Sequence, residues 1–111
     1  MDKKTVLAER FKTGDVEVEG VGTFTVRGMS RWEVAMANKA LEKGGDLEYE
    51  RFVLARCILD PVMTEGEIGE WQKVAGPLEL VTVGNKVNEL SGIGKGADKS
   101  DLPEDGDESG S

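Results

Sequence analysis

Residues 15–28 read Asp15-Val16-Glu17-Val18-Glu19-Gly20-Val21-Gly22-Thr23-Phe24-Thr25-Val26-Arg27-Gly28. Polar and apolar side chains alternate on both sides of a short loop that contains glycine, which is typical of a β-hairpin. The apolar side chains that should share its covered face are Val16, Val18, Phe24 and Val26. A lone hairpin is not stable in water, so we expect it to pack on helices or on another chain. Its edges should stay open to the addition of a further strand.

A capping box follows the hairpin and predicts that the chain continues as a helix. In Ser30-Arg31-Trp32-Glu33 the serine hydroxyl can accept from an early backbone N–H, and the glutamate can reach back to the serine N–H. We expect this helix to cover Arg31–Glu42 and to end at Gly44-Gly45. Asp46 should then cap a second helix over Leu47–Leu59.

These two expected helices carry apolar residues around most of their circumference. A helix on the surface of a globular protein shows a narrower apolar face. Two interpretations follow. Either the helices form the centre of the core, as at least one helix of a small bundle must, or part of their surface meets another protein.

Asp60-Pro61 should break the chain, because the residue before proline is pushed out of the helical region. Two more helices are predicted after this break. Thr64-Glu65-Gly66-Glu67 is a second capping box, and it opens a short helix that Gly76-Pro77 ends. Pro77 is well placed as the first residue of the last helix. The last helix has the clearest apolar stripe of the chain, formed by Leu80, Val83, Val87 and Leu90.

The end of the chain differs in composition from the rest. Residues 97–111 hold six acidic residues and one lysine, and thus most of the net charge of −8. Such a segment buries too little apolar surface to offset its ordering entropy, so we predict a disordered acidic tail over residues 93–111. Residues 1–92 should form one domain of the α+β class, mainly α. In it the hairpin at 15–28 packs on a small bundle of about four helices. A further short helix is expected within Lys3–Lys12, before the hairpin.

The residue composition argues against an enzyme. The chain has no histidine and one cysteine, which removes the usual general base and the commonest metal ligand. Glu65, Glu67 and Glu70 cluster on one expected helix, but acids suit a first turn, and no nucleophile accompanies them. There is no basic stripe for nucleic acid and no apolar run long enough to cross a membrane. We therefore predict a non-enzymatic protein without cofactor or metal.

Binding to another protein is the class of function that remains. The aromatic residues are the first candidates for contact with such a partner. Tryptophan is rarely buried completely and is enriched at the energetic centres of interfaces. Trp71 is the stronger of the two candidates, because its helix is short and its neighbours are polar. The residues expected to contact a partner are Trp32, Met36, Trp71, Val74 and Leu78. Cys57 lies in an apolar run and is expected to be a buried, unreactive side chain.

A recognisable pattern begins with the hairpin and continues with Ser30-Arg31-Trp32-Glu33. It is strongest in three segments, which are Leu59-Asp60-Pro61-Val62-Met63-Thr64-Glu65, Glu70-Trp71-Gln72-Lys73-Val74-Ala75-Gly76-Pro77-Leu78-Glu79 and Val87-Asn88-Glu89-Leu90-Ser91-Gly92. With these segments the chain resembles the tail assembly chaperones of phages and prophages with long non-contractile tails. None of the segments is a catalytic signature.

This resemblance implies a mostly helical chaperone with a small β element that acts in the host cytoplasm. It would bind the tape measure protein, keep it soluble, help recruit the tail tube protein, and be absent from the mature virion. Self-association is expected on a separate ground, because so short a folded part gains stability by docking onto a partner or onto copies of itself. In such families a ribosomal frameshift often makes a longer form. Gly94-Lys95-Gly96 can be encoded through the slippery heptamer A AAG GGN, so we hypothesise that slippage occurs there.

Two other functions remain open at this point. A small acidic regulatory adaptor or DNA mimic would depend on the acidic tail, so deletion of residues 95–111 should abolish its function. A minor structural component of the head–tail junction would be present in purified particles, whereas a chaperone would be absent from them.

Overall fold

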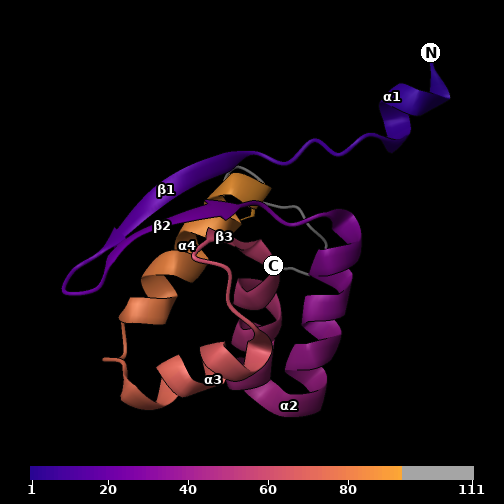
Figure 1. The fold of residues 1–111 in the computed structure, drawn as a ribbon. Coiled ribbons are helices and arrows are strands. Elements are labelled where there is room, and N and C mark those ends of the chain that lie inside the picture. The colour runs from indigo at the N-terminus through magenta and orange to yellow at the C-terminus, as the bar shows by residue number, and fades with distance from the viewer. Residues whose placement is uncertain (94–111) are drawn as a thin grey trace.

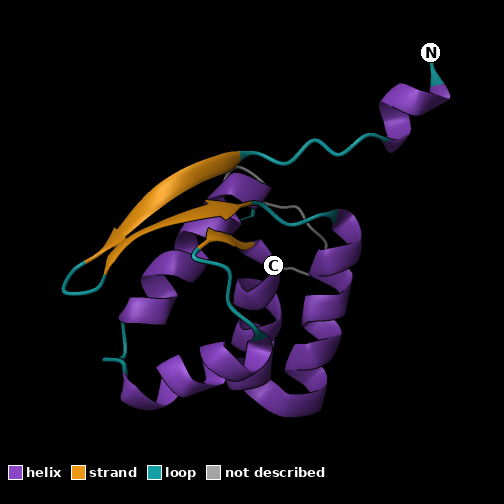
Figure 2. Ribbon diagram, viewed as in Figure 1, coloured by secondary structure: helices purple, strands orange, loops and turns teal. Residues whose placement is uncertain are grey.

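A three-stranded antiparallel sheet lies over a group of helices in the computed structural model, which describes residues 1–93 (Figure 1). The strands are β1 (Thr13–Val18), β2 (Gly22–Arg27) and β3 (Ile58–Asp60), and they lie in the order β1-β2-β3. The helices are α1 (Lys3–Leu7), α2 (Arg31–Cys57), α3 (Glu65–Val74) and α4 (Glu79–Ser91). Figure 2 shows α2, α3 and α4 on the same side of the sheet. The predicted fold class, α+β and mainly α, is confirmed.

The predicted hairpin is β1 and β2, paired in register from Thr13 opposite Arg27 to Val18 opposite Gly22. Its alternation places one set of side chains against the helices. Val18, Phe24 and Val26 are buried, and Val16 packs against them, as expected. Burial of these four side chains gives the sheet the apolar support that an isolated hairpin lacks.

The third strand was not expected, and the helix predicted to reach Leu59 ends at Cys57 instead. Ile58 pairs with Val26 of β2 and is buried, so its side chain belongs to the core that the hairpin covers. The edge of β2 away from β1 has backbone N–H and C=O groups that need hydrogen-bond partners. Pairing with this edge outweighs the helical sequence pattern of residues 58 and 59. The peptide bond between Asp60 and Pro61, which follows, is cis.

Helix α2 contains both helices that were expected between residues 31 and 59. Its capping box is present: the backbone N–H of Glu33 donates to Ser30 Oγ at 3.1 Å, and Ser30 N–H donates to Glu33 Oε1 at 3.0 Å. Gly45 has φ 81° and ψ −164°, which interrupts the helical geometry where Gly44-Gly45 was expected to end the first helix. The backbone leaves helical geometry at Gly45, so the two expected helices are both present, and the label α2 covers them together with the kink that joins them.

Helix α1 is shorter than the expected Lys3–Lys12, since it ends at Leu7 and buries no residue. The guanidinium of Arg10 donates to the carbonyl oxygens of Thr5, Val6 and Ala8, which have no helical partner once the helix stops. Figure 1 shows α1 apart from the sheet and the other helices. The helical stretch ends early because no apolar face of this segment reaches the core.

Helices α3 and α4 keep the expected order but differ in their boundary. The second capping box is present, with Glu67 N–H donating to Thr64 Oγ1 at 3.1 Å and Thr64 N–H donating to Glu67 Oε1 at 2.9 Å. Pro77 is not the first residue of α4, which begins at Glu79 after a turn through Leu78. The turn is favoured because the Glu79 side chain bonds back to the end of α3.

The apolar stripe of α4 supplies much of the core. Leu80, Val83 and Val87 are buried, and Leu90 packs beside them, as the spacing predicted. Fully enclosed side chains from the other elements complete the core, namely Val26, Ala37, Leu54, Cys57, Ile58 and Ile68. The predicted burial of Cys57 is confirmed.

The end of α4 is fastened to the connection between β2 and α2. The backbone N–H of Met29 donates to Ser91 Oγ at 2.8 Å. A Cβ atom at Gly28 would lie 2.8 Å from the carbonyl carbon and oxygen of Leu90, so only glycine permits this approach. A small cavity of about 230 Å³ at this junction is lined by residues 10–12 on one side and residues 90–92 on the other. Apart from Ile93, the predicted acidic tail, including Gly94-Lys95-Gly96, lies outside the described residues.

Candidate protein-binding surfaces

Trp71 is half-buried and packs against the core. Its indole stacks on Phe24 of β2, with ring centroids 5.2 Å apart and an angle of 13° between the planes. Its Nε1–H donates to Glu79 Oε1 at 3.0 Å. The expectation that Trp71 has polar neighbours overlooked Phe24, which is distant in sequence. These contacts join β2, α3 and α4, so Trp71 has a structural role, and its contact with a partner stays a prediction.

Val74 and Leu78 lie at the corner between α3 and α4 and are strongly exposed, at 85% and 71%. Val81 follows one helical turn after Leu78 and is also exposed. We call these three residues the corner patch. Three exposed aliphatic side chains close together in the chain make this corner a candidate surface for contact with another protein.

The corner patch is held in place by hydrogen bonds from Glu79. One carboxylate oxygen accepts from Trp71 Nε1–H, and the other accepts from the backbone N–H of Gly76 at 3.4 Å. Thr82 Oγ1 donates to the carbonyl oxygen of Leu78 at 2.7 Å. The bond between Trp71 and Glu79 therefore ties the corner to a side chain that packs on the core, and a partner would meet a surface that needs little ordering.

Trp32 and Met36 lie four residues apart on the first half of α2, so their side chains share one face of that helix. Trp32 is 61% exposed, whereas Met36 is half-buried. Figure 1 places this half of α2 and the corner between α3 and α4 on opposite sides of the molecule. The five residues expected to contact a partner thus do not form one site.

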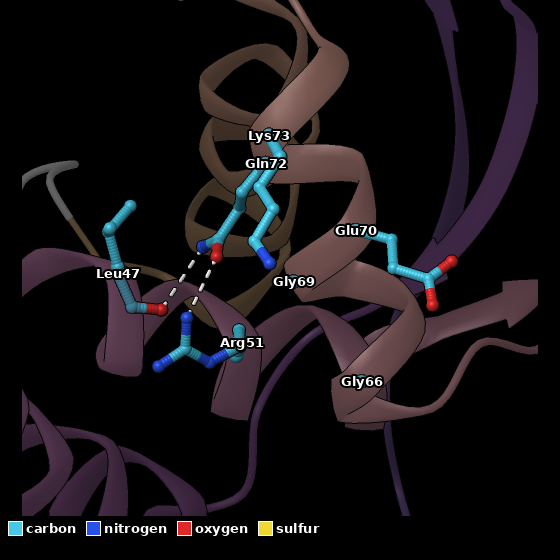
Figure 3. Close-up of a pocket in the computed structure, with 7 residues that line it drawn as sticks. All are labelled: Leu47, Arg51, Gly66, Gly69, Glu70, Gln72 and Lys73. Carbon is cyan, nitrogen blue, oxygen red and sulfur yellow. Dashed lines mark hydrogen bonds between the residues drawn. The ribbon is translucent and has the colours of Figure 1, made fainter.

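A groove between the second half of α2 and α3 was not predicted from the sequence. It has a volume of about 460 Å³ and is lined by Leu47, Arg51, Gly66, Gly69, Glu70, Gln72 and Lys73 (Figure 3). Gly66 and Gly69 leave the backbone of α3 bare on this side. Their spacing of three residues was the signal available in the sequence, but the opposite wall comes from a distant segment.

Hydrogen bonds across the groove hold its two walls together. Gln72 Nε2 donates to the carbonyl oxygen of Leu47 at 3.1 Å, and Arg51 Nη1 donates to Gln72 Oε1 at 3.0 Å. Figure 3 shows Arg51 and Gln72 facing each other while Glu70 points away from them. Arg51 and Gln72 therefore satisfy each other, and the exposed side chain of Leu47 is the apolar part of the groove.

The most buried ion pair within residues 1–93 joins the sheet to α2. Arg27 donates from both terminal nitrogens to the two carboxylate oxygens of Glu33, at 2.8 Å each. These hydrogen bonds, together with those from the Ser30 cap, hold the pKa of the Glu33 carboxyl below its usual value, although burial opposes the shift. The guanidinium also lies over the ring of Phe11, 4.3 Å from its centroid. The two side chains bind each other and their neighbours, so this ion pair stabilises the fold.

The thiol of Cys57 also has a shifted pKa. Burial raises the pKa of its thiol to about 11, so the thiolate is not formed near neutral pH. Residues 1–93 contain no group of three or more His, Cys, Asp and Glu side chains arranged to hold a metal ion. In the same residues no helix combines the length and apolar character needed to cross a membrane.

Comparison with family models, with curated proteins and with solved structures gave no match for this chain. The function is therefore inferred from the surfaces above and from the sequence pattern.

Proposed function

We propose that this protein is a tail assembly chaperone of a long-tailed phage. It binds the tape measure protein in the host cytoplasm, keeps it soluble, promotes assembly of the tail tube protein around it, and is absent from the mature virion. The observation that carries this proposal is the corner patch, which exposes Val74, Leu78 and Val81 on a turn tied to the core. The resemblance of the sequence to this chaperone family supports the choice of partner.

In the proposed mechanism the protein binds its partner and keeps it soluble without catalysing a reaction. The corner patch would cover apolar side chains of a long helical partner that otherwise associate with one another. Full burial of one aliphatic side chain contributes about 1.5–3 kcal/mol, so a few such contacts give a specific but weak complex. The patch is much smaller than the roughly 800 Å² per partner of a stable interface. Tube subunits could therefore displace the chaperone without an energy source, and we expect no ATP hydrolysis.

The test is co-expression with the large, coiled-coil-rich protein encoded beside this gene, followed by a solubility and pull-down assay. The double variant Val74→Ser/Leu78→Ser should lose most of the capture, since it removes the apolar surface and leaves the core unchanged. Val62→Ser is the matched control, because Val62 is 80% exposed and lies in the loop between β3 and α3. Trp71→Ala would be a poor probe, because it would disturb the core.

Three outcomes would contradict the proposal. Equal capture by the corner variant and the Val62→Ser control would show that the corner patch is not the binding surface. Failure of the unaltered protein to bind or solubilise the long protein would remove the chaperone function. Presence of the chain in purified particles would favour the structural head–tail component instead. Circular dichroism of each variant shows whether the fold is retained.

A further inference from the structure

Strand β1 has one paired side and one open side. It lies at the edge of the sheet, beside β2 alone, and no residue among 1–93 pairs with its outer side. Figure 1 shows β1 as the outermost strand, with α1 well away from it. An edge strand of six residues presents a row of backbone groups that can pair with a further strand.

The register identifies the backbone groups that face outward. Gly28 N–H donates to the carbonyl oxygen of Lys12 at 2.9 Å, so Thr13 opposite Arg27 is a pair without mutual hydrogen bonds. Alternation along the ladder then turns the N–H and C=O of Thr13, Asp15 and Glu17 toward the open side. The intervening residues, Gly14, Val16 and Val18, use theirs to bond β2.

The side chains at the outward-bonding positions carry negative charge. Asp15 and Glu17 are exposed on the face of the sheet away from the helices, and Glu19 follows in the loop. Asp15 Oδ1 accepts from Thr25 Oγ1 at 2.9 Å, which fixes its position on this face. A strand added to β1 would place its own side chains directly opposite Asp15 and Glu17, where opposite charges stabilise the pairing and like charges oppose it.

We infer that the open edge of β1 binds an extended, basic segment of a partner protein by strand addition. The backbone of that segment would bond the N–H and C=O groups of Asp15 and Glu17. Alternate Lys or Arg side chains of the segment would pair with the two carboxylates. This surface is separate from the corner patch, so the inference goes beyond the proposed function and does not depend on it.

Charge distinguishes this occupant from the other strands that could bind. A second copy of the chain would bring its own β1 and set Asp15 and Glu17 against carboxylates. Residues 97–111 of the same chain are strongly acidic and meet the same repulsion. Both therefore fit the edge less well than a basic segment does.

The test is amide hydrogen exchange of the full chain, followed by NMR, with the capped peptide Lys-Thr-Lys-Val-Lys-Thr as the probe. Without peptide, the amides of Asp15 and Glu17 should exchange quickly, while those of Val16 and Val18 are protected by the ladder. With peptide, exchange at Asp15 and Glu17 should slow several-fold. Neither the acidic peptide Glu-Thr-Glu-Val-Glu-Thr nor Lys-Pro-Lys-Pro-Lys-Pro, which keeps the charge and lacks strand geometry, should produce this effect.

Two variants separate backbone pairing from attraction of charge. Glu17→Pro removes an outward N–H and no bond to β2, so it should abolish peptide protection at Asp15. Glu17→Ala keeps that N–H and should only weaken the protection. In the corner variant Val74→Ser/Leu78→Ser, the basic peptide should slow amide exchange at Asp15 and Glu17 as much as in the unaltered chain. This result is expected whether or not the variant still binds the tape measure protein.

Unchanged exchange at Asp15 and Glu17 in the unaltered chain with the basic peptide would overturn the inference. Equal protection by the proline peptide would also overturn it, because charge alone would then explain binding. Protection that appears without peptide and grows with protein concentration would assign the edge to a second copy.

Discussion

Glu33 has two roles that meet in one carboxylate, since it completes the cap of α2 and pairs with Arg27 of β2. Glu33→Gln keeps an acceptor for the cap but leaves the mostly buried guanidinium without its counterion. We expect it to lower the free energy of unfolding by about 1–3 kcal/mol. Glu48→Gln is the control, because the Glu48–Arg51 pair is more exposed and should contribute little. Urea unfolding at neutral pH measures both.

The same carboxylate predicts how stability depends on pH. The folded state lowers the pKa of Glu33, so its contribution is fully present above the ordinary glutamate pKa. That contribution is lost as the pH falls through the lowered, folded-state pKa. The unaltered protein should therefore lose its advantage over Glu33→Gln in acid, and an equal difference between the two at all pH values would contradict this account.

At the scale of the elements, the kink in α2 depends on one residue. Gly45 has a backbone conformation that is essentially restricted to glycine, so Gly45→Ala should destabilise the protein by about 1–2 kcal/mol. Gly84 lies within α4, where a Cβ atom would meet nothing within 4 Å. Gly84→Ala should therefore stabilise the protein by about 0.5–1 kcal/mol. The same chemical change has opposite signs at the two sites, and thermal unfolding of both variants tests this.

What the sequence predicted about these elements depended on local signals. The hairpin register follows from the alternation between Val16 and Val26, and both capping boxes are complete within four residues. The signals that failed were tertiary. β3 exists because Ile58 meets Val26, and Trp71 is placed by Phe24. Val74 and Leu78 of the corner patch were named from the sequence as partner contacts, which stays a prediction, whereas the groove beside Leu47 requires two segments brought together by the fold.

At the scale of the whole molecule, Cys57 reports on global opening. It is enclosed by residues from α2, the sheet and the other helices, and burial raises its pKa to about 11. We expect its reaction with a thiol reagent to require unfolding of the whole domain. The free energy of unfolding obtained from the labelling rate should then equal that from circular dichroism. Rapid labelling of the native protein would show that a smaller opening exposes the thiol.

The junction between Gly28 and the end of α4 brings the beginning and the end of the sheet–helix core together. Residues 10–12 and 90–92 line the same small cavity, so the path of the chain from β1 to α4 nearly closes on itself. Because the two ends of the core lie side by side, the packing of its elements does not depend on where the chain begins. A circular permutant that joins Gly92 to Lys12 by a short linker, and opens at the exposed loop around Val62, would contain the same packed core in a different chain order.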